Sequence, residues 1–472
     1  MKGIVALVMA AGKGTRMASD RPKVLHEIAG EPMLGFLLAE LEALRAKGLL
    51  SRVVAIVGHG AEEVRAYLAE VWPWVESVVQ EPQLGTGHAV MQAAPELEGF
   101  EGSVAILNGD VPLFEGATLE ALLAEHEERQ ARLTFLTCEH PRPDGLGRIL
   151  RDPAGRVAGI VEHRDADARQ REIKEINVGV YLAHWPTLRA ALQTITPAND
   201  QGEYYLTDAI AGLVGGGHAV ATVRTDDHVA LGGINTRAEL VSAGAEWRRR
   251  RGAYFLARQV TVEDPATTFI GPRVAIGADT VIEPFTQIHG GSRIGAGCVI
   301  GSHSRLVDAV VGNGATVRSS DVVDSEIGER TTVGPFARLR DHALVGSDAR
   351  IGNFVELKKV AFGDGAKAAH LTYLGDAEVG DRANIGCGTV TCNYDGERKH
   401  RTRIGPGAFI GTNNTLVAPV EIGADAYTAA GSTITEDVPA GALALGRARQ
   451  TVKEGWVARR RASRTEKQKS EA

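Results

Sequence analysis

A six-residue period runs through the second half of the chain and limits its fold more than any other feature. Apolar or small residues recur at every sixth position in three registers. The positions are Ile276, Ile282, Ile288, Ile294, Ile300 and Leu306, then Ile327, Val333, Leu339, Val345, Ile351 and Leu357, then Ile404, Ile410, Leu416, Ile422, Thr428 and Ile434. Glycine often follows the periodic residue, where it suits a tight corner. This pattern predicts a parallel β-helix of hexapeptide units, in which one residue per unit points into a continuous apolar column.

The period slips near 310–326, 360–372 and 390–403. The last slip contains the polar stretch CNYDGERKHRT, residues 392–402, which predicts a loop extruded from the coil. Solenoids often carry such insertions on their binding face, so this loop is a candidate functional segment.

The first half of the chain follows a different pattern. The stretches GIVALVMA (3–10), SRVVAIVG (51–58) and SVAILNG (103–109) are typical of buried strands, whereas EPMLGFLLAELEALRAKG (31–48) has helical spacing. Alternating strands and helices predict a Rossmann-like α/β domain with a mostly parallel sheet, whose ligands bind at the carboxyl ends of the strands.

These patterns predict an α/β domain over 1–235, a linking helix over 236–260, a β-helix domain over 261–447 and a basic tail over 448–472. Four consecutive arginines at 248–251 either bind an anion or form a solvated helix face.

Composition excludes several classes of protein. The formal net charge of −7 disfavours a general nucleic-acid binder. Four cysteines, Cys138, Cys298, Cys387 and Cys392, are too few for a disulfide framework. No apolar run is long enough for a membrane helix. The run at 4–11 is short for a secretion signal and is followed at once by Lys13 and Arg16. We therefore expect a cytoplasmic protein without nucleic-acid or membrane partners.

The stretch AAGKGTRM, residues 10–17, ends the first predicted strand in glycines beside two cations. Exposed backbone N–H groups with Lys13 and Arg16 suit a phosphate. The stretch is not a P-loop, since Gly14 follows Lys13, and Met17 stands where a dinucleotide fingerprint needs glycine. By itself it is either a phosphate cradle or a tight turn.

Further motifs favour a phosphate-binding loop over a simple tight turn. RPKVLHEIAGEPML, QLGTGHAV and LNGDVPL follow, and with them the chain resembles the sugar nucleotidyltransferases. GRI at 147, VEHRDA at 161, EINVG at 175, VGPFARLR at 333, GNFVELKK at 352, HLTYLGDAEVG at 370 and TCNYDG at 391 narrow the resemblance. Over nearly its whole length the chain resembles the bifunctional bacterial N-acetylglucosamine-1-phosphate uridyltransferase/glucosamine-1-phosphate N-acetyltransferase family.

The resemblance implies a set of residues for uridyl transfer. Asp110 after a predicted strand suits either a turn or a hard cation such as Mg²⁺, and the resemblance makes Asp110 and Asn235 the Mg²⁺ ligands. It places Lys23 on phosphate and Arg16 opposite the triphosphate. The other UTP and sugar contacts that it implies are Ala10, Ala11, Gly12, Lys13, Gln80, Gly85, Thr86, Asn108, Gly109, Gly147, Glu162 and Asn177. Asn108 departs from the family, which often has an aromatic residue there.

The resemblance also implies the residues of acetyl transfer, a reaction that needs a base for the amine and donors for the oxyanion. His370 matches the catalytic histidine. The implied glucosamine-1-phosphate contacts are Arg340, Lys358, Tyr373, Asn384 and Lys399, and the acetyl-CoA contacts are Cys387, Asn393, Tyr394, Thr412, Ala430 and Arg447. Cys387 stands where the family commonly has alanine, and Thr412 replaces a common serine.

As a whole, the resemblance implies a cytoplasmic homotrimer with a left-handed β-helix that makes UDP-N-acetylglucosamine for peptidoglycan and lipopolysaccharide. Two alternatives are a single-activity sugar-1-phosphate nucleotidyltransferase with the β-helix as scaffold, and a non-enzymatic regulatory subunit. The first alternative predicts that the HLTY and NYDG stretches are absent, yet the chain contains both. The second predicts that the metal and phosphate residues are replaced, yet Asp110, Asn235, Lys23 and Arg16 are all present.

Overall fold

The structure, a computed structural model, describes residues 3–199 and 201–470. Its contacts divide the chain into two compact units, residues 1–293 and 294–472. Each unit is described by itself. Among the described residues, no helix combines the length and the apolar character that crossing a bilayer requires.

The first unit is built on a sheet with the strand order β11-β7-β10-β6-β1-β4-β5. The strands are β1 (Ile4–Ala10), β4 (Leu50–Val57), β5 (Glu76–Val79), β6 (Ser103–Asn108), β7 (Leu133–Glu139), β10 (Glu175–His184) and β11 (Val220–Thr225). β10 is antiparallel to β6 and β7, whereas the other pairings are parallel. β8 (Arg148–Arg151) and β9 (Val157–Val161) form a hairpin beside β10. The carboxyl ends of six strands therefore share one edge.

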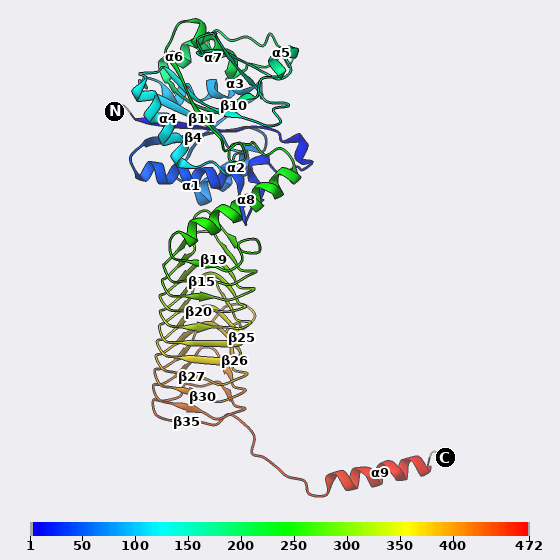
Figure 1. The fold of residues 1–472 in the computed structure, drawn as a ribbon. Coiled ribbons are helices and arrows are strands. Elements are labelled where there is room, and N and C mark those ends of the chain that lie inside the picture. The colour runs from blue at the N-terminus through cyan, green and yellow to red at the C-terminus, as the bar shows by residue number, and fades with distance from the viewer. Residues whose placement is uncertain (1–2, 200, 471–472) are drawn as a thin grey trace. The chain divides into compact units, whose positions relative to one another are not determined.

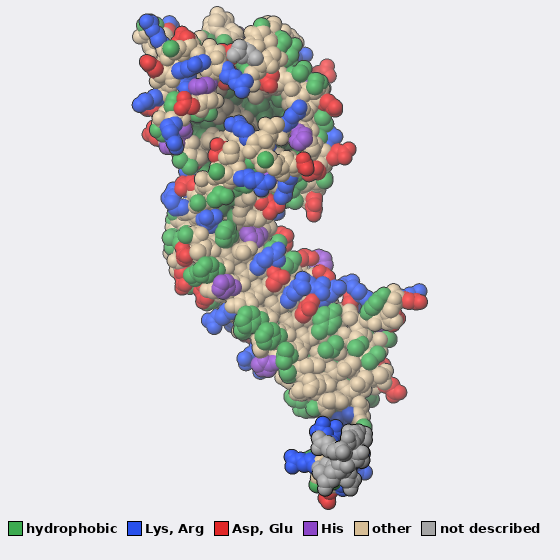
Figure 2. Space-filling model, turned by 90° about the vertical axis from the view of Figure 1, so that its right-hand side faces the viewer, with side chains coloured by type: hydrophobic (Ala, Val, Ile, Leu, Met, Phe, Trp, Pro, Cys, Tyr) green, Lys and Arg blue, Asp and Glu red, His purple; other side chains and the backbone are tan. Residues whose placement is uncertain are grey.

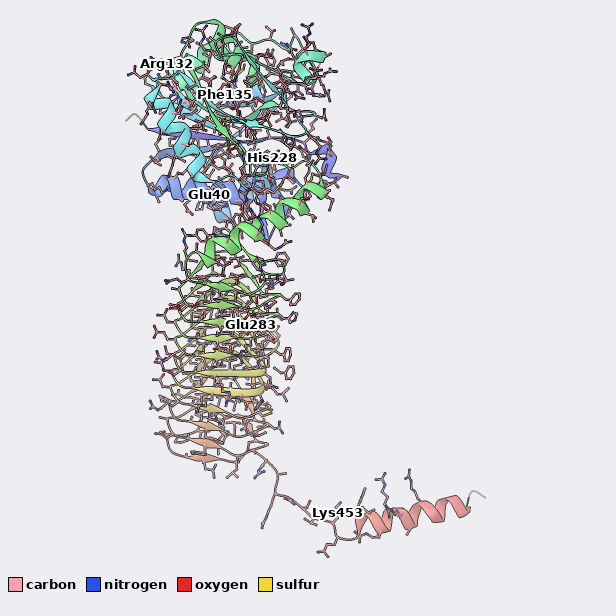
Figure 3. The ribbon with its side chains drawn as sticks, viewed as in Figure 1. Glu40, Arg132, Phe135, His228, Glu283 and Lys453 are labelled. Carbon is pink, nitrogen blue, oxygen red and sulfur yellow. The ribbon has the colours of Figure 1, made fainter. Side chains whose placement is uncertain are left out.

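Helices cover both faces of this sheet (Figure 1). The helices of the first unit are α1 (Met33–Ala46), α2 (Ala61–Val71), α3 (Thr86–Gln92), α4 (Gly116–Glu128), α5 (Ala168–Arg171), α6 (Trp185–Leu192), α7 (Leu206–Gly215) and α8 (Arg237–Leu256). The unit also contains the single turns η1 (Thr15–Met17), η2 (Lys23–Leu25) and η3 (Pro95–Leu97), and the strand pair β2 (Glu27–Ile28) and β3 (Glu31–Pro32). Alternate residues of β1 enter two different cores. Ala6 and Val8 pack with α1, α2 and α4, whereas Leu7 packs with α3, α6, α7 and Phe135 of β7. Figure 3 labels Phe135 within the first unit. This double burial explains why the strand is apolar throughout.

Short parallel strands follow α8. They are β12 (Thr261–Val262), β13 (Phe269–Ile270), β14 (Ala275–Ile276), β15 (Val281–Ile282), β16 (Gln287–His289), β17 (Arg293–Ile294), β18 (Val299–Ile300), β19 (Arg305–Val311), β20 (Thr316–Val317), β21 (Asp321–Ile327), β22 (Thr332–Val333), β23 (Arg338–Arg340), β24 (Ala343–Val345), β25 (Arg350–Phe362), β26 (Lys367–Val379), β27 (Asn384–Ile385), β28 (Val390–Cys392), β29 (Thr402–Ile404), β30 (Phe409–Ile410), β31 (Thr415–Val417), β32 (Val420–Ile422), β33 (Tyr427–Thr428), β34 (Thr433–Ile434) and β35 (Leu443–Ala444). Helix α9 (Trp456–Ser470) lies in the basic tail.

Within the second unit the strands from β18 onward stack as coils, with Ile385 beside Ile410 and Ile410 beside Thr428. All the periodic residues of the sequence pattern are buried, except Ile276, which is half-buried. The predicted β-helix and the predicted α/β fold are confirmed. Hydrophobic side chains also reach the surface in patches along the solenoid (Figure 2).

The predicted domain boundaries stay a prediction. Helix α8 falls inside the range 236–260, but the two compact units meet at residue 293 rather than at 261.

Candidate active sites

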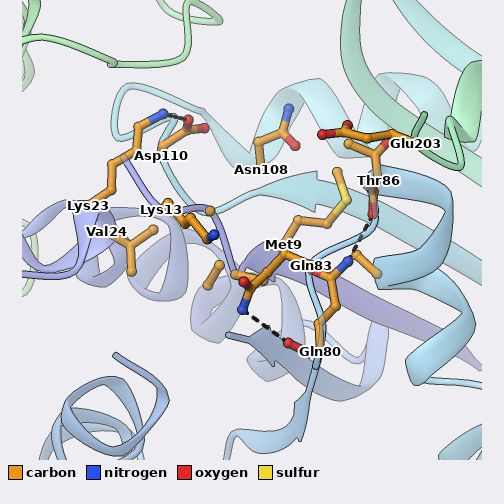
Figure 4. Close-up of a pocket in the computed structure, with 15 residues that line it drawn as sticks. Met9, Lys13, Lys23, Val24, Gln80, Gln83, Thr86, Asn108, Asp110 and Glu203 are labelled. Atoms are coloured by element: carbon orange, nitrogen blue, oxygen red, sulfur yellow. Dashed lines mark hydrogen bonds and ion pairs between the residues drawn. The ribbon is translucent and has the colours of Figure 1, made fainter. Parts of the chain in front are cut away.

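Three strand ends of the first unit converge on one cavity of about 440 Å³ (Figure 4). Gly12 and Lys13 follow β1, Gln80 follows β5, and Asp110 lies two residues after β6. The residues of the sequence prediction that line the cavity are Ala10, Ala11, Gly12, Lys13, Lys23, Gln80, Gly85, Thr86, Asn108 and Asp110. The AAGKGTRM stretch thus lies where the sheet topology places a ligand.

Lys23 joins two residues that are far apart in the sequence. Its Nζ donates to Asp110 Oδ2 at 2.5 Å and to Asn235 Oδ1 at 2.7 Å. Asn235 Nδ2 donates to the Gly233 carbonyl at 3.0 Å, which turns its Oδ1 toward Lys23. One carboxylate oxygen and one amide oxygen therefore both accept from the Lys23 ammonium.

This donor set fits a hard divalent cation. Carboxylate and amide oxygens are ligands that such ions prefer, and Mg²⁺ often takes only one or two of them together with substrate phosphates. Within residues 3–199 and 201–470 no group of three or more His, Cys, Asp or Glu side chains is arranged to hold a metal ion. Asp110 and Asn235 would therefore share the ion with substrate oxygens.

The buried amide of Gln80 is largely committed to its own loop. Its Nε2 donates to the Gly85 carbonyl at 2.9 Å and lies 3.2 Å from His88 Nδ1. Only its Oε1 is left to accept from a ligand. Gly85 has a φ of +105°, and a Cβ there would lie 2.7 Å from the Tyr204 carbonyl, so the turn requires glycine.

A second cavity of about 330 Å³ shares Asn108 and Asp110 with the first. Gly147, Glu162, Asn177 and Asn235, all predicted from the sequence, also line it. The backbone N–H of Asn177 donates to the Gly147 carbonyl at 2.9 Å, and the Thr207 hydroxyl donates to Glu162 Oε1 at 3.0 Å. Burial raises the pKa of Glu162, so its environment penalises the carboxylate form.

Two predicted residues line neither cavity. Arg16 is exposed on η1. Gly109 is buried, and its N–H donates to the Met9 carbonyl between β6 and β1 at 2.9 Å. Gly109 therefore connects the ends of β6 and β1 but does not face either cavity.

The sequence reasoning missed other lining residues, including Gln83, Glu203, His140 and His228. Gln83 stands one residue before the LGTGHA stretch and could have been found there. Glu203 lies at the first cavity because the neighbouring Tyr204 N–H donates to the Leu84 carbonyl. No sequence pattern predicts this contact.

In the second unit, His370 on β26 lies beside Asn353 on β25. His370 Nδ1 is 2.5 Å from Asn353 Oδ1. An amide oxygen only accepts, so this contact puts the imidazole proton on Nδ1 and leaves the Nε2 lone pair for a substrate. The geometry gives His370 the form that a general base needs.

Three cations gather on the same part of the solenoid. The register pairs Arg340 of β23 with Lys358 of β25, and the extruded loop brings Lys399 to Lys358. The Lys399 ammonium is the main cause that lowers the pKa of Lys358, and desolvation and the Arg340 charge lower it further. Cations held this close favour a bound anion such as a phosphate.

The corner of the solenoid that carries His370 recurs on each of the next three coils. Ala368 pairs with Ile385, Ile385 with Ile410, and Ile410 with Thr428. The residues two positions after each of these occupy the same corner on successive coils. They are His370, Cys387, Thr412 and Ala430. A straight row of this kind suits an extended ligand whose reactive end reaches His370.

The other residues predicted to contact acetyl-CoA or the sugar lie on strands, in the extruded loop and near the tail. Asn393 is buried and donates to Asp376 at 2.6 Å, whereas Tyr394 in the loop and Arg447 near the tail are exposed. Tyr373 lies on β26, and Asn384 begins β27.

Comparison with known proteins gives both halves of the chain a family. A MobA-like NTP transferase domain model matches residues 6–258, and a bacterial transferase hexapeptide model of six repeats matches residues 268–307 and 401–436. Curated relatives named bifunctional protein GlmU include that of Pelotomaculum thermopropionicum, 49% identical over 97% of this chain and 99% of the relative. Those of an Exiguobacterium species and of Heliobacterium modesticaldum are each 48% identical over 96% of this chain, covering 99% and 98% of the relatives.

Proposed function

The chain belongs to the bifunctional GlmU family, and from this premise we propose which of its residues carry the two reactions. It is a bifunctional enzyme. It acetylates glucosamine-1-phosphate with acetyl-CoA, and it transfers UMP from UTP to N-acetylglucosamine-1-phosphate, giving UDP-N-acetylglucosamine and pyrophosphate.

The uridyl-transfer site spans the two cavities of the first unit. UTP occupies the larger cavity, against Ala10 to Lys13, Gln80, Gly85 and Thr86, and the sugar occupies the smaller one, against Gly147, Glu162 and Asn177. Asp110 lines both cavities, so the attacking sugar phosphate meets the α-phosphorus of UTP beside it. This shared position is the observation that carries the assignment.

The protein's work in this reaction is positioning and charge neutralisation. Lys23 donates to a phosphate oxygen, and Arg16 reaches the triphosphate from η1. Asp110 and Asn235 would hold Mg²⁺, which when bound neutralises charge on the reacting phosphates.

In acetyl transfer, His370 Nε2 takes a proton from the amine of glucosamine-1-phosphate. The amine nitrogen then bonds to the thioester carbonyl carbon and the C–S bond breaks. The proton held on His370 Nε2 passes to the sulfur, so that coenzyme A leaves as the thiol. Arg340, Lys358 and Lys399 hold the sugar phosphate, while Tyr373 and Asn384 contact the sugar and the oxyanion. The corner row Cys387, Thr412 and Ala430, with Asn393, Tyr394 and Arg447, holds acetyl-CoA.

The surface of the second unit supports a homotrimer. Phe336 and Phe354 are each more than half exposed, and their rings stack with centroids 5.5 Å apart. Phe409 and Tyr427 form a second exposed stack, at 5.1 Å. Exposed apolar rows of this kind mark interaction surfaces. We place the trimer in the cytoplasm, where UTP and acetyl-CoA are made.

One assay tests the two activities together. The full chain is supplied with glucosamine-1-phosphate, acetyl-CoA, UTP and Mg²⁺, and thiol and pyrophosphate release are followed separately. Both products are expected. A parallel reaction is supplied with N-acetylglucosamine-1-phosphate in place of glucosamine-1-phosphate. Pyrophosphate release in that reaction, with no thiol release in the first, would instead support a single-activity nucleotidyltransferase.

A further inference from the structure

The strand order lays the uridyl-transfer site across the edge of the sheet in a fixed sequence. Gln80 follows β5, Lys13 follows β1, Asp110 follows β6, and Asn177 lies at the same edge on antiparallel β10. The nucleotide end, the phosphates and the sugar end thus run from β5 toward β10. Beyond the sugar end, the next carboxyl ends are those of β7 and β11.

Two histidines meet at those strand ends. β7 and β11 are parallel, with Cys138 beside Thr225, and the loops that leave them carry His140 and His228. The two imidazole centroids are 5.1 Å apart, and the rings are nearly perpendicular. Both residues line the smaller cavity together with Glu162 and Asn177. Figure 3 shows His228 in the loop between β11 and α8.

The contacts of these rings leave donors for a ligand. The Arg142 backbone N–H donates to His140 Nδ1 at 3.1 Å, so neutral His140 carries its proton on Nε2. Burial lowers the pKa of His140, and His228 lowers it further, which favours this neutral form. Within the described residues, neither His140 Nε2 nor either ring nitrogen of His228 has a hydrogen-bond partner.

A metal site does not explain the pair. The nearby Cys138 thiol is buried, its Sγ donates to the Glu139 carbonyl at 3.5 Å, and burial raises its pKa. The thiolate that a metal needs is therefore disfavoured. Of the side chains that the structure describes, no three His, Cys, Asp or Glu residues converge to hold an ion.

We propose that His140 and His228 recognise the sugar ring of the acceptor by donating hydrogen bonds to its hydroxyl or acetamido oxygens. The pair stands on the side of the cavity away from the nucleotide, with unshared N–H donors, and a sugar presents many acceptor oxygens. This inference rests on the proposed placement of the sugar in the smaller cavity. It adds two residues that no sequence motif marks.

The test compares equilibrium binding of UDP and UDP-N-acetylglucosamine to the full chain by calorimetry, because the two ligands differ only in the sugar. His140→Phe and His228→Phe keep a ring for packing but remove the donors. Each should weaken UDP-N-acetylglucosamine binding about tenfold, the effect of losing one well-formed hydrogen bond, and leave UDP binding within about twofold. His218→Phe, which alters an exposed histidine in a different hollow, is the matched control.

A circular dichroism spectrum and a thermal unfolding midpoint equal to those of the parent chain confirm that each variant is folded. The proposal is overturned if UDP-N-acetylglucosamine binding is unchanged in both Phe variants, or if UDP binding falls by the same factor, which would place the pair on the phosphates. Glu162→Gln distinguishes a failure of the proposed role of His140 and His228 from a failure of the proposed placement of the sugar in the smaller cavity. If it weakens sugar binding while the histidine variants do not, only the role of the pair fails. If it also has no effect, the sugar does not occupy this cavity and the proposed site fails as well.

Discussion

At the scale of single residues, Lys23, Asp110 and Asn235 meet at the point where we propose that the first reaction takes place. The ammonium bridges Asp110 and Asn235, which are 125 positions apart in the sequence. Both cavities open onto Asp110, so this carboxylate lies where the charges of two substrates meet.

Asp110→Asn should lower uridyl transfer by about 10²- to 10³-fold, because the substitution removes the anionic oxygen from a cation site whose charge is worth several kcal/mol. Acetyl transfer should not change, since its residues lie in the other compact unit. Pyrophosphate release at saturating Mg²⁺ measures the effect. A rate near that of the parent enzyme would rule out Asp110 as the ligand.

Glu162 gives a pH-dependent expectation. Burial raises its pKa above the unfolded value, so the ionised side chain disfavours folding at neutral pH. That penalty disappears as pH falls through the raised pKa toward about 4.3, the ordinary glutamate value. Glu162→Gln should therefore raise Tm at pH 8, by a margin that shrinks as the pH is lowered to 5. A margin that grows on acidification would contradict the sign of the shift.

His370→Ala should lower the kcat of acetyl transfer by about 10²- to 10⁴-fold, the usual contribution of a general base. KM for glucosamine-1-phosphate should change little, because in the proposed site Arg340, Lys358 and Lys399, rather than His370, hold the phosphate. Asn353→Ala keeps the imidazole but removes the acceptor that fixes its proton on Nδ1, so it should give a smaller loss. Thiol-release kinetics on variants with normal circular dichroism provide the measurement. A His370→Ala rate within threefold of the parent would remove His370 from the mechanism.

At the scale of elements, helix α8 holds the loop that carries Asn235. Thr236 and Glu239 form a capping box at the helix start, and Glu239 Oε2 also accepts from the Asn235 backbone N–H at 2.6 Å. Farther along α8, Arg250 pairs with Asp227 of the same loop at 2.7 Å and with Glu115 at 3.1 Å. The loop is therefore fastened at both ends.

Arg250→Ala should lower the kcat/KM of uridyl transfer by roughly 10- to 10²-fold, because small displacements of positioned groups carry costs of that order. The matched control is Arg249→Ala, since the exposed Arg249 pairs with Glu246 and, among the described residues, forms no hydrogen bond or ion pair with the loop. Equal effects of the two substitutions would show that the loop does not depend on Arg250.

Much of the fold could be predicted from the sequence because each element repeats a local rule. The six-residue period identified the buried column almost residue by residue, and Asp110 was marked by its place after an apolar strand. The pairing of His140 with His228 could not be predicted. It depends on the register that sets Cys138 beside Thr225, and the sequence between them does not specify that register. The acceptor beside His370 was missed for the same reason, because strand pairing brings Asn353 there.

At the scale of the whole molecule, the residues proposed for the two reactions lie in separate compact units. Those proposed for acetyl transfer come from the solenoid and its loop, whereas those proposed for uridyl transfer lie mainly at the strand ends of the α/β sheet. The product proposed for one site is the substrate proposed for the other, and the residues assigned to each site belong to a single compact unit. N-acetylglucosamine-1-phosphate is therefore expected to pass between them through solution.

The most direct measurement is complementation between the two inactive variants. Asp110→Asn and His370→Ala are supplied with glucosamine-1-phosphate, acetyl-CoA and UTP, singly and mixed, and UDP-N-acetylglucosamine is quantified by chromatography. Each variant alone should make almost none, Asp110→Asn should accumulate N-acetylglucosamine-1-phosphate, and the mixture should form the nucleotide sugar at a rate set by the two intact sites. Full conversion by either single variant, or no product from the mixture, would contradict two independent sites on one chain.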